Sequence, residues 1–209
     1  MILGAGLDTR AYRLEWPPRF HFYEVDQPGV LEFKRAALGG CSAEPRCERR
    51  TVGADLRGEW PAALHEAGFD SESRTAWVAE GLLAYLPAEA QQRLLERVHG
   101  LSPTASRLAL DRIAGELDGD GGARLQRLSA RSGIEMDRLM TAEARADIGD
   151  WLGSRSWTVE EVAADAVAAR YGRDLGDPFR DRAEPAGSAQ DAEPPWLDTV
   201  FLTARSGDG

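Results

Sequence analysis

Four acidic side chains, each just after an apolar segment, have the clearest potential for chemistry in this sequence. They are Asp8, Asp26, Asp55 and Glu80. If the apolar segments are successive parallel strands, these side chains meet at one edge of a sheet, where ligands of open α/β sheets bind. An acid after a strand can also cap the next helix. For Asp26, Asp55 and Glu80, their succession favours the binding interpretation.

A glycine loop precedes the first of these acids. Gly4-Ala5-Gly6 follows the apolar residues Met1–Leu3, and glycine lets a backbone bend and approach a ligand closely. The dinucleotide fingerprint G-x-G-x-x-G requires a third glycine where this sequence has Thr9. The loop therefore indicates a nucleotide-type ligand. Without the third glycine, a nicotinamide cofactor is the least favoured of the three interpretations that we consider.

The composition argues against several classes of partner. The 209 residues suffice for one domain with its own core, and the formal net charge is −10. Such an acidic chain has no general electrostatic attraction for nucleic acid or anionic lipid. The N-terminus has an apolar run of only three residues, Met1–Leu3, before the glycine loop and Asp8, so we expect no secretion signal. We also expect no membrane-spanning segment, because no stretch approaches the required apolar length. We predict a cytoplasmic protein that binds neither nucleic acid nor membrane, and the sequence leaves its oligomeric state open.

Cysteine, lysine and histidine offer little chemistry here. Cys41 and Cys47 lack the second pair that a zinc site requires, so we expect two thiols and no metal. Lys34 is the only lysine, which we attribute to codon usage, and we assign it no function. The three histidines fall away from the expected ligand edge, and none is a persuasive general base: His21, His65 and His99.

Strand-like and helix-like segments alternate along the first half of the chain. Strand patterns cover residues 1–3, 20–26, 49–55, 75–86 and 106–113, and helical patterns cover 27–38, 60–68 and 87–101. Further helical patterns cover 123–140 and 159–172, a polar Pro-rich loop covers 177–195, and a last strand covers 196–205. The alternation predicts a doubly wound α/β sheet, mostly parallel, with an antiparallel C-terminal edge and helices on both faces.

Four ordered motifs resemble those of one protein family. They are LGAGLDTRAYRL, YEVDQP followed by a lysine-bearing helix, GADLR, and AWVAEGLLAYLP. Together they resemble the S-adenosylmethionine-dependent methyltransferases related to leucine carboxyl methyltransferase, a group with many bacterial O-methyltransferases of unassigned substrate. The similarity runs from Met1 to about Asp111, and more loosely through DWLGSRSWTV and ARYGR to the final strand. It implies a class I methyltransferase fold, which is Rossmann-like, and S-adenosyl-L-methionine as cofactor.

The resemblance places the glycine loop and Glu80 beside the methionine part of the cofactor. Gly4 and Gly6 would bring backbone against it, and the following helix would offer free N–H groups and its dipole to the carboxylate. Glu80 would balance the ammonium and sulfonium charges. Asp8 and Arg10 are expected to shape the loop by hydrogen bonds.

The resemblance assigns the adenosine part to the next two acids. Asp26 would accept hydrogen bonds from the ribose hydroxyls, and Glu24, on the same strand face, is the runner-up. Asp55 would accept from the adenine amino group, while Leu56 packs on the ring or lends its backbone N–H. Tyr85 is a possible pocket residue, although an aromatic in this position is more often part of the core. We name no catalytic residue.

The resemblance predicts methyl transfer to an oxygen of a small molecule. A carboxylate acceptor needs no base because it is ionised near neutral pH, whereas a hydroxyl needs one. The lack of a well-placed histidine favours a carboxylate or an acidic phenol. The alternative is a catalytically silent domain that binds the cofactor or a partner, because family members carry a helical segment before the first strand and this sequence has nothing before Met1.

The resemblance also suggests how the chain is organised. We expect a single methyltransferase domain over residues 1–209. Residues 1–114 would be its cofactor-binding half, residues 115–195 a helical and loop insertion that selects the acceptor, and residues 196–205 the final strand.

Overall fold

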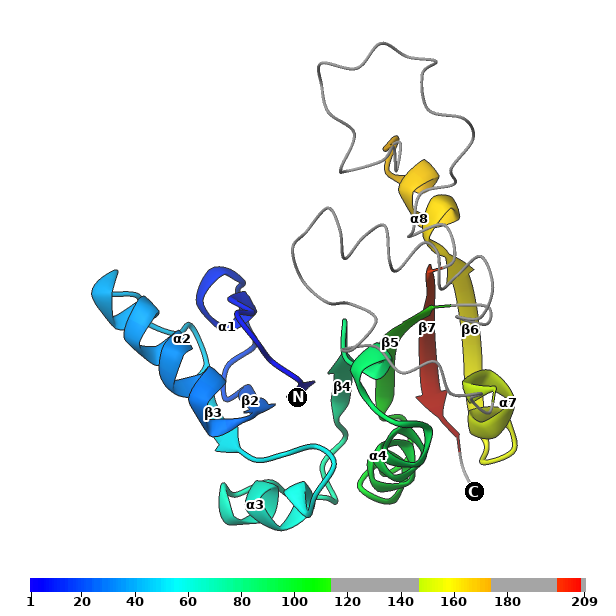
Figure 1. Ribbon diagram of the computed structural model, residues 1–209, viewed down its shortest axis with the longest axis horizontal. Helices are drawn as coiled ribbons and strands as arrows, with labels where there is room; N and C mark the ends of the chain where they lie inside the picture. Colours follow the sequence, from blue (N-terminus) through cyan, green and yellow to red (C-terminus); the bar gives the residue numbers. More distant parts are fainter. Residues whose placement is uncertain (114–146, 174–198, 208–209) are drawn as a thin grey trace.

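The described residues of the chain form one seven-stranded sheet (Figure 1). The computed structural model describes residues 1–113, 147–173 and 199–207. The strand order is β3-β2-β1-β4-β5-β7-β6. The first five strands pair in parallel, and β7 is antiparallel to both its neighbours, so the predicted mostly parallel sheet is confirmed. The strands are β1 (Ile2–Leu3), β2 (His21–Asp26), β3 (Glu48–Gly53), β4 (Ala76–Ala79), β5 (Arg107–Ile113), β6 (Trp157–Ala163) and β7 (Thr199–Ser206).

Helices lie on both faces of the sheet, as predicted. The helices α3, α4 and α7 bury side chains in the main core, whereas α1 and α2 contact the opposite face. None of the helices in the described ranges is long and apolar enough to cross a membrane. They are α1 (Arg10–Arg13), α2 (Pro28–Gly40), α3 (Trp60–Glu66), α4 (Ala88–Gly100), α7 (Ile148–Gly153), α8 (Ala164–Arg170) and the 3-10 turn η1 (Leu83–Tyr85).

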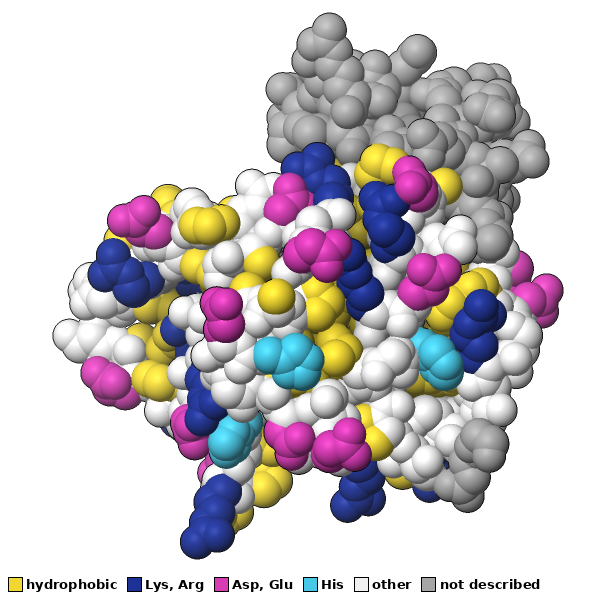
Figure 2. All heavy atoms as spheres, turned by 90° about the horizontal axis from the view of Figure 1, so that it is seen from below, with side chains coloured by type: hydrophobic (Ala, Val, Ile, Leu, Met, Phe, Trp, Pro, Cys, Tyr) yellow, Lys and Arg dark blue, Asp and Glu magenta, His cyan; other side chains and the backbone are white. Residues whose placement is uncertain are grey.

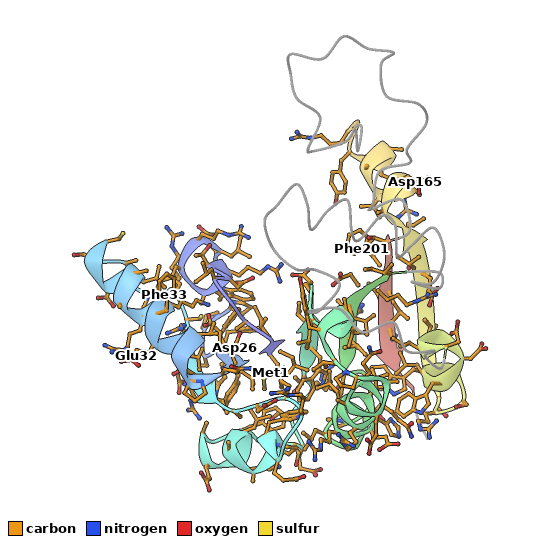
Figure 3. All side chains as sticks on the ribbon, viewed as in Figure 1. Met1, Asp26, Glu32, Phe33, Asp165 and Phe201 are labelled. Carbon is orange, nitrogen blue, oxygen red and sulfur yellow. The ribbon has the colours of Figure 1, made fainter. Side chains whose placement is uncertain are left out.

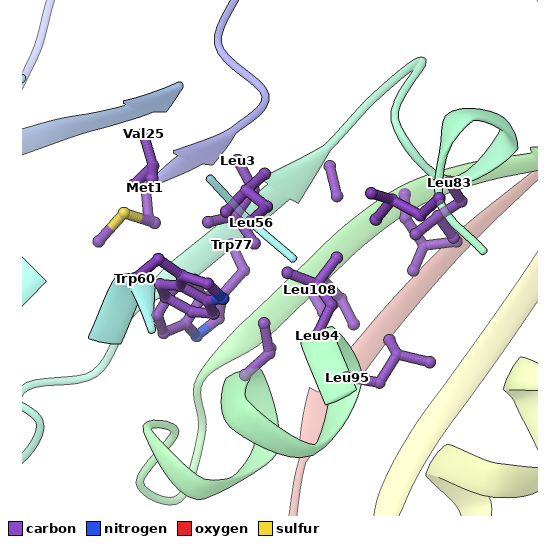
Figure 4. Packing of buried hydrophobic residues seen from close by; sticks show 14 of the residues in the cluster. Met1, Leu3, Val25, Leu56, Trp60, Trp77, Leu83, Leu94, Leu95 and Leu108 are labelled. Atoms are coloured by element: carbon purple, nitrogen blue, oxygen red, sulfur yellow. The ribbon is translucent and has the colours of Figure 1, made fainter. Parts of the chain in front are cut away.

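The main core fills the space between the sheet and helices α3 and α4. Side chains alternate along β2, so Tyr23 and Val25 enter this core while Phe22 faces the other side. Trp60 of α3 packs edge-on against Trp77 of β4, with ring centroids 6.2 Å apart and an interplanar angle of 72° (Figure 4). This arrangement suits the quadrupoles of aromatic rings and fixes α3 under the centre of the sheet.

The C-terminal strands differ from the prediction in two ways. The last strand is β7, but it lies between β5 and β6, so β6 forms the edge of the sheet. A helix was predicted over residues 159–172, yet residues up to Ala163 belong to β6 and only α8 is helical. The long ladder between β6 and β7 explains this difference, because tertiary pairing overrides the helical propensity of a short segment. The predicted helix over 123–140 and the loop over 177–195 lie outside the described residues.

Candidate functional site

The strand order brings the four predicted motifs together at the carboxyl edge of the sheet. In spatial order along the sheet, Asp55 follows β3, Asp26 ends β2, the glycine loop follows β1 and Glu80 follows β4. The register agrees, because Leu3 pairs with Val25 and Asp26 pairs with Gly53. Ligands of open α/β sheets bind at this edge.

Three backbone N–H groups of the glycine loop donate hydrogen bonds to the end of β2, two to a backbone carbonyl and one to a side chain. The N–H groups of Gly4 and Ala5 both donate to the carbonyl of Val25, at 2.9 and 3.1 Å. The N–H of Gly6 donates to Asp26 Oδ2 at 2.6 Å. Gly4 and Gly6 have φ values of 67° and 44°, in the left-handed region that favours glycine. The conformation of the loop therefore depends on both glycines and on the carboxylate of Asp26.

We expect the Gly4→Ala substitution to lower the free energy of unfolding by about 1–2 kcal/mol, because an L-residue is strained at this φ. The new Cβ would also lie 3.1 Å from Leu82 Cδ1. Gly29→Ala is the control, since Gly29 is in α2 with nothing within 4 Å of an added Cβ, and it should stabilise by about 0.4–1 kcal/mol. Urea unfolding followed by circular dichroism measures both, and equal effects would contradict the role of the Gly4 conformation.

Asp26 presents a carboxylate whose two oxygens are already oriented by backbone. In addition to the Gly6 bond, Asp26 Oδ1 accepts from the N–H of Gln27 at 2.7 Å. The side chain is partly buried at the end of β2 (Figure 3). Each carboxylate oxygen has a further lone pair, so these contacts leave room for hydroxyl donors from a ligand.

Glu24, the runner-up for the ribose, is not at the ligand edge. Its side chain is 0% exposed, and Oε2 accepts from Lys34 Nζ at 2.6 Å and from Arg49 at 2.7 Å. Arg49 in turn lies over the ring of Tyr12 at 5.4 Å. The interpretation of Glu24 as a ribose ligand is therefore wrong. Lys34, for which the sequence predicts no function, is a buried structural cation that joins α2 to β2.

Asp55 and Leu56 lie at the end of β3 with different surroundings. Both oxygens of Asp55 accept from the side chain of Arg57, which also donates its backbone N–H at 2.9 Å. These bonds hold the pKa of Asp55 below its usual value, so the carboxylate is ionised at neutral pH. Leu56 is 7% exposed and its side chain packs in the main core. A ligand would meet the carboxylate of Asp55 on the surface, with Leu56 beneath.

Glu80, after β4, forms an ion pair with Arg10, the first residue of α1. Arg10 also donates its backbone N–H to Asp8 Oδ1 at 2.7 Å, which agrees with the expectation that Asp8 and Arg10 shape this loop. The helix α1, which follows the glycine loop, has only four residues, so its macrodipole is small. Tyr85 is 45% exposed, and the reading of its ring as part of the core is wrong.

One acid at this edge was not among the predicted site residues. Asp111 lies near the end of β5, and its Oδ1 accepts from the backbone N–H of Gly81 at 2.6 Å. Gly81 has a φ of 60° and directly follows Glu80, so Asp111 holds the turn that presents Glu80. The signal was present in the sequence, because Asp111 is a further acid after an apolar strand segment.

The three histidines lie near the opposite ends of the strands. His21 begins β2, His65 contacts the carbonyl of Phe69, and His99 accepts from Trp157 at the start of β6 at 3.0 Å. Histidine side chains are accordingly visible in Figure 2, which looks at the molecule from below the view of Figure 1. In the part of the chain that the structure describes, no three His, Cys, Asp or Glu side chains gather as a metal site requires.

Comparison with known proteins finds relatives that are named as methyltransferases. A family model described as leucine carboxyl methyltransferase matches residues 1–99. A protein of Saccharopolyspora erythraea named "Putative S-adenosyl-L-methionine-dependent methyltransferase" is 45% identical over 189 residues, which cover 90% of this chain and 64% of that protein. A similarly named protein of Mycolicibacterium smegmatis is 44% identical over 190 residues, with the same coverage. The chain thus spans 64% of the length of these relatives.

Solved structures share the fold at low identity. Human N-acetylserotonin methyltransferase in complex with S-adenosylmethionine superposes with a TM-score of 0.54 at 12% identity, over 99% of this chain and 47% of that chain. The YcgJ protein of Bacillus subtilis superposes with a TM-score of 0.56 at 11% identity, over 100% of this chain and 91% of that chain. The sheet order and the glycine loop after β1 define the class I methyltransferase fold. The chain therefore resembles the S-adenosylmethionine-dependent methyltransferases related to leucine carboxyl methyltransferase, whose family model matches its residues 1–99.

Proposed function

We propose that this chain binds S-adenosylmethionine at the carboxyl edge of β1 to β4 and is part of an enzyme that methylates an oxygen of a small molecule. The observation that carries the proposal is the placement of the glycine loop between Asp26 and Glu80, with Asp55 one strand further along. The names of the relatives support the cofactor and the reaction class.

The residues at this edge suit the chemical groups of that cofactor. The loop offers open backbone, since nothing lies within 4 Å of a Cβ added at Gly6. We assign the ribose hydroxyls to Asp26 and the adenine amino group to Asp55, because ionised carboxylates accept from such donors. Glu80 offers a negative charge to the ammonium and sulfonium groups. Gly4 and the backbone N–H of Leu56 complete the contacts that we propose.

For this reaction the chain must bind and orient its ligands and exclude water. When bound, the cofactor supplies a methyl group that its sulfonium charge activates. A carboxylate acceptor is our preferred substrate class, because it needs no base and because the family description supports carboxyl methylation. The histidines at the other ends of the strands agree with this preference. Tyr85, exposed beyond Glu80, is our candidate for a contact with the acceptor.

Three broader points belong to the same proposal. Residues 1–209 would form a single domain, with residues 1–114 as its cofactor-binding half and 196–205 as the final strand. Residues 115–195 would choose the acceptor. The protein would act in the cytoplasm, which agrees with its acidic composition and the two free thiols of Cys41 and Cys47.

Calorimetric titration with S-adenosylhomocysteine tests cofactor binding by this chain. We expect a dissociation constant of about micromolar size, and no heat from NAD under the same conditions. A folded chain that binds neither nucleotide would contradict the proposal, and a chain that binds NAD alone would replace it with nicotinamide chemistry.

Transfer of a labelled methyl group to small carboxylic acids and phenols tests the acceptor class. Methyl esters hydrolyse in mild base whereas methyl ethers do not, so base treatment of the labelled product separates the two. We expect a base-labile product. A base-stable product would move the acceptor to a hydroxyl.

A further inference from the structure

Arg10 is a cation held between two carboxylates at the end of the site nearest β4. Its guanidinium pairs with Glu80 from the segment after β4, and its Nε lies 3.3 Å from Asp8 Oδ2. The hydrogen bond to Glu80 is the largest of the effects that raise the pKa of Arg10. The side chains of Arg10 and Glu80 are 27% and 49% exposed, so both charges remain open to a ligand.

The position of this pair matches one end of the proposed ligand. Along the edge of the sheet the order is Asp55, Asp26, the glycine loop and then the Arg10–Glu80 pair. If adenine lies at β3 and ribose at β2, the amino-acid end of the ligand reaches the space between β1 and β4. Leu82 packs close to Gly4, which keeps the two segments that carry the pair together.

We propose that the amino-acid end of the cofactor exchanges with this internal ion pair. The carboxylate of the ligand pairs with the guanidinium of Arg10, and the ammonium of the ligand pairs with the carboxylate of Glu80. Every charge then keeps an opposite partner, because one internal pair is replaced by two pairs with a zwitterion. Asp8 keeps hold of Arg10 during the exchange. This inference rests on the proposed function, and it makes Arg10 a specificity-determining residue.

The exchange has a consequence for ligand choice. An exposed ion pair is weak, so a zwitterion separates it at little cost. A nucleoside with no charged tail leaves the internal pair closed and gains nothing from either residue. A ligand with only the ammonium must separate the pair and leaves Arg10 with Asp8 alone. The chain should therefore select adenosine derivatives that carry an intact α-amino acid.

The test compares ligands and variants in one titration series. The ligands are S-adenosylhomocysteine, its decarboxylated analogue and 5′-methylthioadenosine, which lacks the amino acid. We expect Arg10→Gln to weaken the binding of S-adenosylhomocysteine about tenfold or more, as for the loss of a charged hydrogen bond. The affinity for 5′-methylthioadenosine should be unchanged. The decarboxylated analogue should bind the unmodified chain about as weakly as S-adenosylhomocysteine binds Arg10→Gln. The Arg10→Gln substitution should not weaken the binding of this analogue further. Arg13→Gln is the control, because Arg13 is exposed in the same helical turn.

The outcomes separate this inference from the proposal on which it rests. If both adenosine ligands bind and Arg10→Gln changes neither, the ion-pair exchange is wrong and the cofactor proposal stands. If the unmodified chain binds no adenosine ligand, both are wrong. Should Arg10→Gln unfold, the decarboxylated analogue still decides on the unmodified chain, since equal affinity for it and S-adenosylhomocysteine overturns the inference. Glu80→Gln should likewise affect only ligands that carry the ammonium.

Discussion

Replacing Lys34 by methionine should lower the free energy of unfolding by about 3–5 kcal/mol, which is the usual effect of removing one partner from a buried ion pair. Lys34 is 1% exposed and Glu24 is 0% exposed, with 2.6 Å between Nζ and Oε2. Methionine fills a similar volume, so the loss is electrostatic rather than a cavity effect. Since domains of this kind are stable by about 5–15 kcal/mol, the change is a large fraction of the total.

Arg35→Met is the matched control for Lys34→Met. Arg35 is next to Lys34 in α2, but its side chain is 74% exposed and its contact with Glu32 is long, at 3.8 Å. We expect a change of about 0.5 kcal/mol or less. Urea unfolding followed by circular dichroism measures both variants. A loss below about 1 kcal/mol for Lys34→Met would mean that Arg49 alone neutralises Glu24.

The Asp26→Ala substitution should weaken S-adenosylhomocysteine binding by about 1.5–3 kcal/mol, the usual value for hydrogen bonds to a charged group. The structure adds a second reason, because the same carboxylate accepts from the N–H of Gly6 and orders the glycine loop. Asp26→Asn separates the two effects: the amide oxygen can still accept from Gly6, while the second acceptor is lost. We expect Asp26→Asn to bind more tightly than Asp26→Ala and less tightly than the unmodified chain.

Glu32→Ala is the control for the Asp26 variants. Glu32 is an exposed acid on the outer side of α2 (Figure 3), so its removal changes the net charge by the same amount. The Glu32→Ala variant should bind S-adenosylhomocysteine with the same affinity as the unmodified chain. Calorimetry gives the affinities, and thermal unfolding shows that each variant is folded. Unchanged affinity in Asp26→Ala would remove Asp26 from the ribose role, and buried Glu24 is in no position to replace it.

The parts of the fold and site that depend on local patterns could be predicted from sequence. The strand patterns alternate with helical patterns, so β1 to β5 were each identified from a local signal. The fourth predicted strand was too long, because residues 75–86 form β4 (Ala76–Ala79) and then the 3-10 turn η1 (Leu83–Tyr85). Asp26 and Glu80 were predicted as site residues because an acid at the end of a strand is a local signal. The same rule applied to Asp111 would have found the side chain that holds Gly81.

The parts that depend on distant partners could not be predicted. Lys34 looks like an ordinary helical lysine until β2 brings Glu24 and β3 brings Arg49 beside it. The strand β6 contains charged and alanine residues that suit a helix, and only pairing with β7 makes it extended. The ion pair between Arg10 and Glu80 joins residues 70 positions apart, so no local pattern indicates it.

The burial of Lys34 also gives the chain an unusual chemical property. Lys34 is its only lysine and is 1% exposed, so the single side-chain amine is shielded from solvent while α2 rests on β2. An amine-directed acylating reagent can reach it only when that helix lifts away. The rate of acylation at Lys34 therefore measures how often α2 separates locally from β2.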